Sequence, residues 1–400
     1  MLKVAVFFGG KTVEHDVSVV TALQLMENLD KTKYDIIPIY ITRQGDWFTG
    51  KKLMSVKGVQ SFDPADSELE RCYLPANVRA RQLYRYNTKD TLFKKQDRLI
   101  ASIDVAIPAM HGLNGEDGTL QGLLELAGVP YTSCGVLGSA AGMDKILMKA
   151  AFKGAGLPVL PYIFFDRGSI KENMQKHLDD AEATLSYPMF VKPANLGSSI
   201  GISKANNREE LENAIVVASH YDRRILVEQG VSSLCEINCS ALGFGDDVTP
   251  SVCEMPVTWE EFLTYDEKYM RGGKSAKGSK GASGMASLSR QIPAPISEDM
   301  TKVVEDCTVK AFRLLDCKGV VRIDYIIDKA TDTLYINEIN TIPGSFAYYL
   351  WEPKGITYPE LLDKLIDYAI KAHNESKNNE YAYDSEILTR YGQGQGGVKK

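Results

Sequence analysis

The sequence lacks three features that would assign it to common classes of protein. No apolar run approaches the roughly 20 residues that a helix needs to cross a bilayer. The seven cysteines are an odd and scattered set without a Cys-x-x-Cys pair, so neither a disulfide framework nor a zinc site is indicated. An excess of positive charge is also missing, since the formal net charge is -6, and this gives no reason to expect nucleic acid or an acidic membrane as a partner. We therefore expect a cytoplasmic protein with free thiols.

The length and composition predict two or three globular domains, because 400 residues with 44% hydrophobic content can form more than one sizeable core. Residues 2–8 are too short for the apolar core of a signal peptide and predict a first buried strand. Gly9-Gly10 and a helix that we expect to end near Asn28 follow, as in the opening of a βαβ unit. Gly10-Lys-Thr12 is not a P-loop, because that motif needs a glycine five residues before Gly10, where Ala5 stands.

Three charged residues stand where strands and helices change over. Glu14 lies in the first turn of the first helix, where it is either favoured by the helix dipole or available to bind a substrate ammonium. Lys145 begins a later helix, and Lys192 ends the buried run 188–193. A hairpin at 194–203 follows Lys192, and its glycines allow the backbone to approach a phosphate closely.

A polar hairpin near the C-terminal end carries the strongest chemical signal. Two strand-like runs, 320–328 and 334–340, flank a turn centred near Thr331. Because side chains alternate across a strand, Arg322 and Asp324 share one face of the first run. Charged groups thus occupy positions where apolar residues would normally pack.

Pairing about this turn places Asp324 opposite Glu338 and Arg322 opposite Asn340. Two carboxylates and an amide oxygen are ligands that Mg²⁺ accepts, and a guanidinium beside them can stabilise charge on a transferred phosphoryl group. The hairpin therefore predicts a magnesium and nucleotide site, with cross-strand ion pairs on a solvated sheet as the alternative. We expect the opposite face to form the core with Ile323, Tyr325, Ile327, Tyr335 and Ile339.

Two further segments are candidates for contact with a nucleotide. Residues 224–231 have the form of an edge strand that could offer its backbone to an adenine, with Glu228 or Glu236 near a ribose. Residues 270–284 carry five glycines and four cations, so they predict a mobile loop. That loop is either an insertion without a role or a cationic lid that closes over a triphosphate.

These blocks together resemble the D-alanine-D-alanine ligases of the ATP-grasp superfamily over about residues 3–370. The matching blocks are Gly9-Gly-Lys-Thr-Val-Glu-His-Asp-Val-Ser18, His111-Gly-Leu-Asn-Gly-Glu-Asp-Gly-Thr-Leu-Gln-Gly122, 131–136, 143–145, 191–193, 197–199, 268–269, 322–324 and 337–344. Several blocks in the right order are far more specific than any single one.

The resemblance implies a fold of class α/β and α+β, a three-domain ATP-grasp fold with an N-terminal α/β parallel-sheet domain. The expected divisions are an N-terminal domain at 1–134 with the first-substrate site, a central subdomain at 135–222, a C-terminal subdomain at 223–375 with the metal site and a mobile lid at 270–290, and a flexible tail at 376–400. A homodimer is expected as well.

The resemblance also implies a reaction in which ATP converts the carboxylate of a first D-alanine into an acyl phosphate. The amine of a second D-alanine then displaces phosphate, as peptidoglycan precursor synthesis requires. Glu14 would bind the first ammonium in a triad with Ser198 and Tyr269, and His111 would lie near that substrate. Arg322 and the backbone N–H of Gly344 would stabilise the acyl phosphate and the oxyanion.

The remaining implied roles concern ATP and metal. Lys145, Lys192 and Lys268 would hold phosphates, and the adenosine would be surrounded by Glu228, Gln229, Val231 and Glu236. Two Mg²⁺ ions, for which Mn²⁺ can substitute, would be bound by Asp324, Glu338 and Asn340.

The acceptor stays open in the sequence. The Lys268-Tyr269 pair resembles the relatives that make a dipeptide rather than an ester. Family members usually have a serine and a leucine that contact the second D-alanine, and this sequence aligns Tyr349 and Leu350 there. A phenol fills more volume than a small hydroxyl, so D-serine or another amino acid is the alternative acceptor. An ATP-binding protein without ligase activity is the alternative of a different class.

Overall fold

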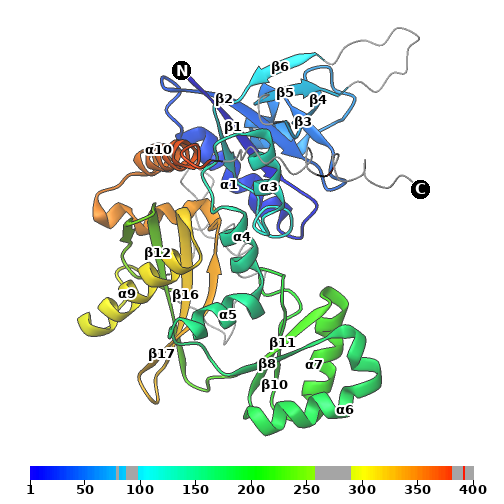
Figure 1. Cartoon of the computed structure of the whole chain (residues 1–400), viewed down its shortest axis with the longest axis vertical. Helices are drawn as coiled ribbons and strands as arrows, with labels where there is room; N and C mark the ends of the chain where they lie inside the picture. The colour runs from blue at the N-terminus through cyan, green and yellow to red at the C-terminus, as the bar shows by residue number, and fades with distance from the viewer. Residues whose placement is uncertain (78–80, 87–97, 257–289, 381–390, 392–400) are drawn as a thin grey trace, which may run out of the picture.

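Three main β-sheets organise the protein (Figure 1). The structure is a computed structural model that describes residues 1–77, 81–86, 98–256, 290–380 and 391. No helix among these residues is long and apolar enough to cross a membrane. All seven cysteines are free thiols, as expected.

The first sheet has seven strands in the order β6-β5-β4-β3-β2-β1-β7. The strands are β1 (Leu2–Gly9), β2 (Tyr34–Ile41), β3 (Trp47–Thr49), β4 (Glu70–Tyr73), β5 (Gln82–Arg85), β6 (Leu99–Ser102) and β7 (Val105–Pro108). Strand β1 is buried between β2 and β7 and parallel to both, so the βαβ opening is confirmed. The helical segments are α1 (His15–Asn28), η1 (Lys51–Met54), α2 (Val56–Gln60) and α3 (Thr119–Ala127), and α1 ends where the sequence predicted.

The second sheet has the order β10-β9-β11-β8. Its elements are β8 (Tyr162–Asp166), α6 (Arg167–Thr184), β9 (Met189–Pro193), β10 (Ser203–Ala205), α7 (Arg208–Tyr221) and β11 (Arg224–Gln229). The prediction of an edge strand at 224–231 is wrong, because β11 pairs with β9 on one side and β8 on the other. Its uninterrupted apolar run, Ile225 to Val227, is fully buried, as is typical of an internal strand.

The third sheet has the order β13-β12-β16-β17 and is covered by α9 (Figure 1). Its elements are β12 (Leu234–Phe244), β13 (Asp247–Pro250), α9 (Glu298–Leu314), β16 (Lys318–Asp328) and β17 (Thr333–Asn340), and a short pair consists of β14 (Met255–Pro256) and β15 (Arg290–Gln291). The predicted pairing of Asp324 with Glu338 and of Arg322 with Asn340 is confirmed.

A β-bulge divides this hairpin. Beyond Asp324 the register shifts, so that Tyr325 pairs with Ile336 and Asn337 is the extra residue. One inserted residue reverses which face of the sheet the side chains on its far side, residues 334–336, occupy. Tyr335 is therefore only half-buried and was wrongly assigned to the core, whereas Leu334 and Ile336 are buried there.

Helices α4 (Val136–Met143) and α5 (Lys145–Gly154) connect the first sheet to the other two (Figure 1). Asp144 ends the first of these helices and caps the second, since its carboxylate accepts hydrogen bonds from the backbone N–H groups of Ile146 and Leu147 at 3.1 and 2.9 Å. This cap fixes the start of α5, and with it the position of Lys145.

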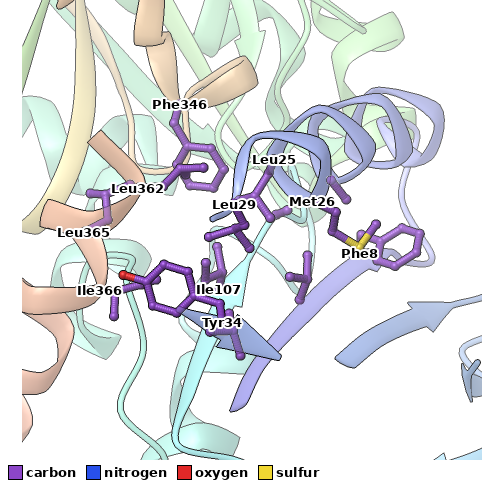
Figure 2. Packing of buried hydrophobic residues seen from close by; sticks show 14 of the residues in the cluster. Phe8, Leu25, Met26, Leu29, Tyr34, Ile107, Phe346, Leu362, Leu365 and Ile366 are labelled. Carbon is purple, nitrogen blue, oxygen red and sulfur yellow. The ribbon is translucent and has the colours of Figure 1, made fainter. Parts of the chain in front are cut away.

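The C-terminal part of the chain completes the core of the first sheet. After η4 (Gly344–Leu350) and η5 (Glu352–Lys354), helix α10 (Tyr358–Ser376) packs on the N-terminal region. Figure 2 shows Phe346 and Leu362 beside Leu25 and Leu29 of α1, and all four are buried. One hydrophobic core thus joins the two ends of the chain.

Candidate active site

A cleft lies between the second and third sheets. Seven of the residues predicted for nucleotide and metal binding line it, namely Lys192, Glu228, Gln229, Val231, Glu236, Asp324 and Glu338. Leu160, Phe190 and Ile326 add apolar surface to the same cleft. Residues from two sheets therefore surround one space.

Lys145 lies beside this cleft, at the start of α5. It is buried, its Nζ donates a hydrogen bond to the Leu196 carbonyl at 2.8 Å, and the same atom is 3.7 Å from Glu338 Oε2. The helix thereby joins the loop after Lys192 to the carboxylate-bearing strand β17.

A row of buried charges continues from the second sheet into the third. Lys192 Nζ donates to Glu228 Oε2 at 2.6 Å and to Asn337 Oδ1 at 3.0 Å. Glu228 also forms an ion pair with Lys149 of α5. Burial alone would raise the pKa of Glu228, but the two lysines hold it below its usual range.

The hairpin brings the predicted metal ligands together. Arg322 binds Asp324 through two hydrogen bonds of 2.6 and 2.8 Å, and Asn340 Nδ2 donates to Asp324 Oδ2 at 3.0 Å. Glu338 stands directly opposite Asp324 in the ladder. Two carboxylates and an amide on adjacent strands form a hard-oxygen donor set that fits Mg²⁺.

Glu14 occupies a second part of the site, at the N-cap of α1. It is buried and accepts a hydrogen bond from Ser198, which lies on the loop between β9 and β10. Two glycines make room for this carboxylate, since a Cβ on Gly112 or Gly197 would lie 2.4 or 2.9 Å from Glu14 Oε2. The structure thus brings together two residues that are 184 positions apart in the chain.

Two titratable residues connect this region to the loop after β17. Glu116 accepts hydrogen bonds from the backbone N–H groups of Gly112 and Ile342, both at 2.9 Å, and desolvation together with Glu14 raises the pKa of Glu116 to about 8. His111 is hydrogen-bonded to Thr21 at 2.9 Å, and burial lowers the pKa of His111 to about 4. His111 is therefore neutral at pH 7.

The loop after Pro343 has an unusual backbone. Ser345, Phe346 and Ala347 all have positive φ angles, between 50° and 56°. Three consecutive non-glycine residues in the left-handed region carry strain, which is typical of functional loops. Packing of Phe346 in the shared core and a hydrogen bond of 2.6 Å from Ser345 Oγ to Gln24 hold this loop, and with it Gly344, against α1.

Tyr349 and Leu350 are buried, and Tyr349 belongs to a charged cluster. Its hydroxyl donates to Glu254 Oε1 at 2.9 Å, and the Arg290 guanidinium lies 4.0 Å from the centre of its ring. Arg290 in turn binds Glu254 at 2.9 Å. The phenol is thus held in one place by a hydrogen bond to Glu254 and a cation–π contact with Arg290.

Sequence reasoning missed Lys149, Asn337, Glu116, Glu254 and Arg290. Lys149 follows Lys145 by four residues, so helical periodicity could have placed both on one face, and Glu116 lies inside the block 111–122 that the sequence already marked. The positions of Asn337, Glu254 and Arg290 depend on the bulge and on tertiary packing. The predicted Lys268, Tyr269 and nearly all of the lid at 270–290 lie outside the described residues, as does most of the tail at 376–400.

The second and third sheets enclose a cleft lined by Lys192 and several carboxylates, and Glu14 of the N-terminal region lies against a loop of the second sheet, which is the arrangement of the ATP-grasp ligases. Models of the D-ala D-ala ligase N-terminus and C-terminus match residues 3–134 and 151–367. The chain belongs to the D-alanine-D-alanine ligase family, whose members are ATP-dependent carboxylate-amine ligases.

Individual relatives agree over nearly the whole chain. The D-alanine-D-alanine ligase of Acetivibrio thermocellus is 39% identical over 384 residues, which cover 94% of this chain and 97% of the relative. That of Thermoanaerobacter sp. is 40% identical over 383 residues, with 93% and 98% covered.

Solved structures show the same fold. The VanG D-Ala:D-Ser ligase from Enterococcus faecalis is 30% identical with a TM-score of 0.76, over 92% of this chain and 99% of that one. The D-alanine-D-alanine ligase from Coxiella burnetii is 27% identical with a TM-score of 0.74, over 94% and 98%.

Gly197→Ala should raise the KM for the amino acid substrate at least tenfold, because the added Cβ would lie 2.9 Å from Glu14 Oε2 and push the carboxylate away from Ser198. Steady-state kinetics check this, with circular dichroism to confirm the fold. Gly122→Ala in α3 is the matched control, since a Cβ there meets nothing within 4 Å. A wild-type KM in Gly197→Ala would contradict the assigned packing.

His111 should make stability depend on pH. Its folded pKa of about 4 lies below the ordinary value of 6.5, so the unfolded chain binds more protons between these values. The free energy of unfolding should therefore fall by up to about 3 kcal/mol as the pH drops from 6.5 to 4. Urea unfolding at several pH values should show a smaller drop in His111→Gln than in the wild type, and equal drops would refute the assignment.

Proposed function

We propose that this protein joins two D-alanines into D-alanyl-D-alanine, with cleavage of ATP to ADP and phosphate, for peptidoglycan precursor synthesis. One observation carries the proposal. Hydrogen bonds of Glu116 and Ser345 tie the loop after β17, which contains Gly344, to the N-terminal region. The region around Glu14 is thereby joined to the β16–β17 hairpin and to the cleft proposed for phosphate and metal. In the proposed complex, an amino acid held at Glu14 directs its carboxylate toward the cleft.

The roles of the described residues follow from this arrangement. Glu14, held by Ser198, binds the ammonium of the first D-alanine, and neutral His111 lies near it without adding charge. A carboxylate oxygen of this substrate attacks the terminal phosphorus of ATP, ADP leaves, and an acyl phosphate forms. Arg322 and the Gly344 N–H stabilise the negative charge that develops on the reacting oxygens.

The second step uses the amine of the second D-alanine. The ammonium group loses one proton to solvent, and its nitrogen attacks the acyl carbon. The bond from this carbon to the phosphate oxygen then breaks, and phosphate leaves with the second proton as the amide bond forms. Phosphate is a far better leaving group than an oxide ion, which is why ATP is needed. The acceptor lies against Tyr349 and Leu350, where the phenol ring limits the space beside it.

The cleft holds ATP. Lys145 and Lys192 bind its phosphates, and the adenosine lies among Glu228, Gln229, Val231 and Glu236, supported by their position along one cleft. We also propose that Asp324, Glu338 and Asn340 hold two Mg²⁺ ions. Bound there, the metal neutralises phosphate charge, and no step depends on any other metal chemistry.

Three further expectations stay proposals. The three sheets support a division into domains at 1–134, 135–222 and 223–375. A cytoplasmic location and a homodimer follow from the family resemblance.

Incubation with ATP, magnesium and D-alanine should release phosphate and form D-alanyl-D-alanine, identified by mass. A panel with D-serine, D-lactate and L-amino acids tests the acceptor. A mixed product with D-serine would favour the alternative acceptor. Absence of any product from a folded protein would overturn the ligase assignment.

Glu338→Gln should lower phosphate release by at least a hundredfold, because it removes one of two carboxylates from the proposed magnesium site and leaves the ladder intact. Glu209→Gln on α7, whose side chain is exposed, is the control and should keep full activity. Wild-type activity in Glu338→Gln would exclude Glu338 from the metal site.

A further inference from the structure

Lys149 is a buried cation to which the proposed mechanism gives no role. Its side chain is 0% exposed, and it follows Lys145 by one helical turn on α5. Charged lysines are almost never fully buried unless they are paired, because desolvating an ammonium group is costly. The residue with which Lys149 is paired therefore indicates its role.

The partner of Lys149 is Glu228, and Glu228 is shared. One carboxylate oxygen, Oε1, pairs with Lys149, and the other, Oε2, accepts a hydrogen bond of 2.6 Å from Lys192. The side chain of Glu228 is 1% exposed, that of Lys192 is 10% exposed, and Lys192 lines the cleft. The three groups thus form a row that runs from the interior to the wall of the cleft.

The charge balance of this row decides what Lys192 presents to a ligand. A single carboxylate bound to Lys192 alone would cancel its charge and draw its ammonium into the protein. With Lys149 on the far side, the row carries two cations and one anion, and the exposed end is Lys192. Burial lowers the pKa of Lys149, and Glu228 opposes this effect.

Asn337 fixes the direction of Lys192. Its Oδ1 accepts a hydrogen bond of 3.0 Å from Lys192 Nζ, across the gap between the second and third sheets. Asn337 is the extra residue of the bulge in β17, and it lines the cleft. Lys192 is thus held between the two sheets rather than folded back along its own strand.

We propose that Lys149 is a positioning residue for the nucleotide. It offsets the charge of Glu228 from the buried side, so that the row presents a net positive charge at Lys192 and the Lys192 ammonium stays directed toward the phosphates. The inference rests on the nucleotide site proposed above. Lys149 touches no ligand itself and acts through Glu228.

The test compares the dissociation constants of ATP, ADP and adenosine, measured by calorimetry in the presence of magnesium. The ratio of adenosine to ATP dissociation constants isolates what the phosphates contribute. Lys149→Met should lower this ratio at least tenfold, because Glu228 then cancels the charge of Lys192. The double variant Lys149→Met/Glu228→Gln should restore it, and Lys149→Arg, which keeps the charge, should stay near the wild-type ratio.

A merely structural role would weaken the binding of ATP and of adenosine by the same factor. An unchanged ratio of the two dissociation constants in Lys149→Met would therefore overturn the inference. If Lys149→Met does not fold, Glu228→Gln alone decides: it frees Lys192 from its shared partner, so the ratio should rise at least threefold, and an unchanged or lower ratio refutes the proposal. A wild type that binds adenosine and ATP equally would instead overturn the phosphate site itself.

Discussion

The shared hydrophobic core between the two ends of the chain is the constraint on which the rest of the structure depends. Helix α10 and Phe346 pack against α1 and the first sheet, so residues more than 300 positions apart share one core. This packing fixes the strained loop after Pro343 beside the helix whose N-cap is Glu14. Together with the hydrogen bonds of Ser198 to Glu14 and of Ile342 to Glu116, it fixes the position of Glu14 relative to the hairpin. Burial of many apolar side chains is a suitable source of stability for a loop with three positive φ angles, since such strain persists only when its surroundings hold it.

A single inserted residue, Asn337, connects the β16–β17 hairpin to the second sheet. Up to Asp324 the strands pair in simple register, which places the carboxylates and Arg322 on one face. At the bulge Asn337 leaves that register and reaches Lys192 of the second sheet. The same shift moves Leu334 and Ile336 into the core in place of Tyr335. One local irregularity thus serves both the packing of the third sheet and its connection to the second.

Several buried charges of the described site occur in pairs that compensate one another. Arg322 binds Asp324, Lys149 and Lys192 share Glu228, and Arg290 binds Glu254 beneath Tyr349. An isolated charge in these places would be strongly destabilising, whereas a paired one costs little and keeps its direction. Glu116 differs because its hydrogen bonds come from backbone N–H groups rather than from a cation. Desolvation and the nearby Glu14 raise the pKa of Glu116 to about 8.

The sequence by itself determined the parts of the protein that depend on local periodicity and on short-range pairing. Strand β1, the end of α1 at Asn28 and the register of Asp324 with Glu338 all follow from alternation and turn position, and the order of the motif blocks identified the family. Tertiary structure decided the rest. Strand β11 is internal because β9 and β8 both pair with it, and its short apolar run alone does not say how many strands do so. Tyr335 left the core because a bulge reversed the alternation, and Lys149 gained its partner only when α5 packed against β11. Local patterns report which face of an element is apolar, but which element meets that face depends on contacts between distant parts of the chain.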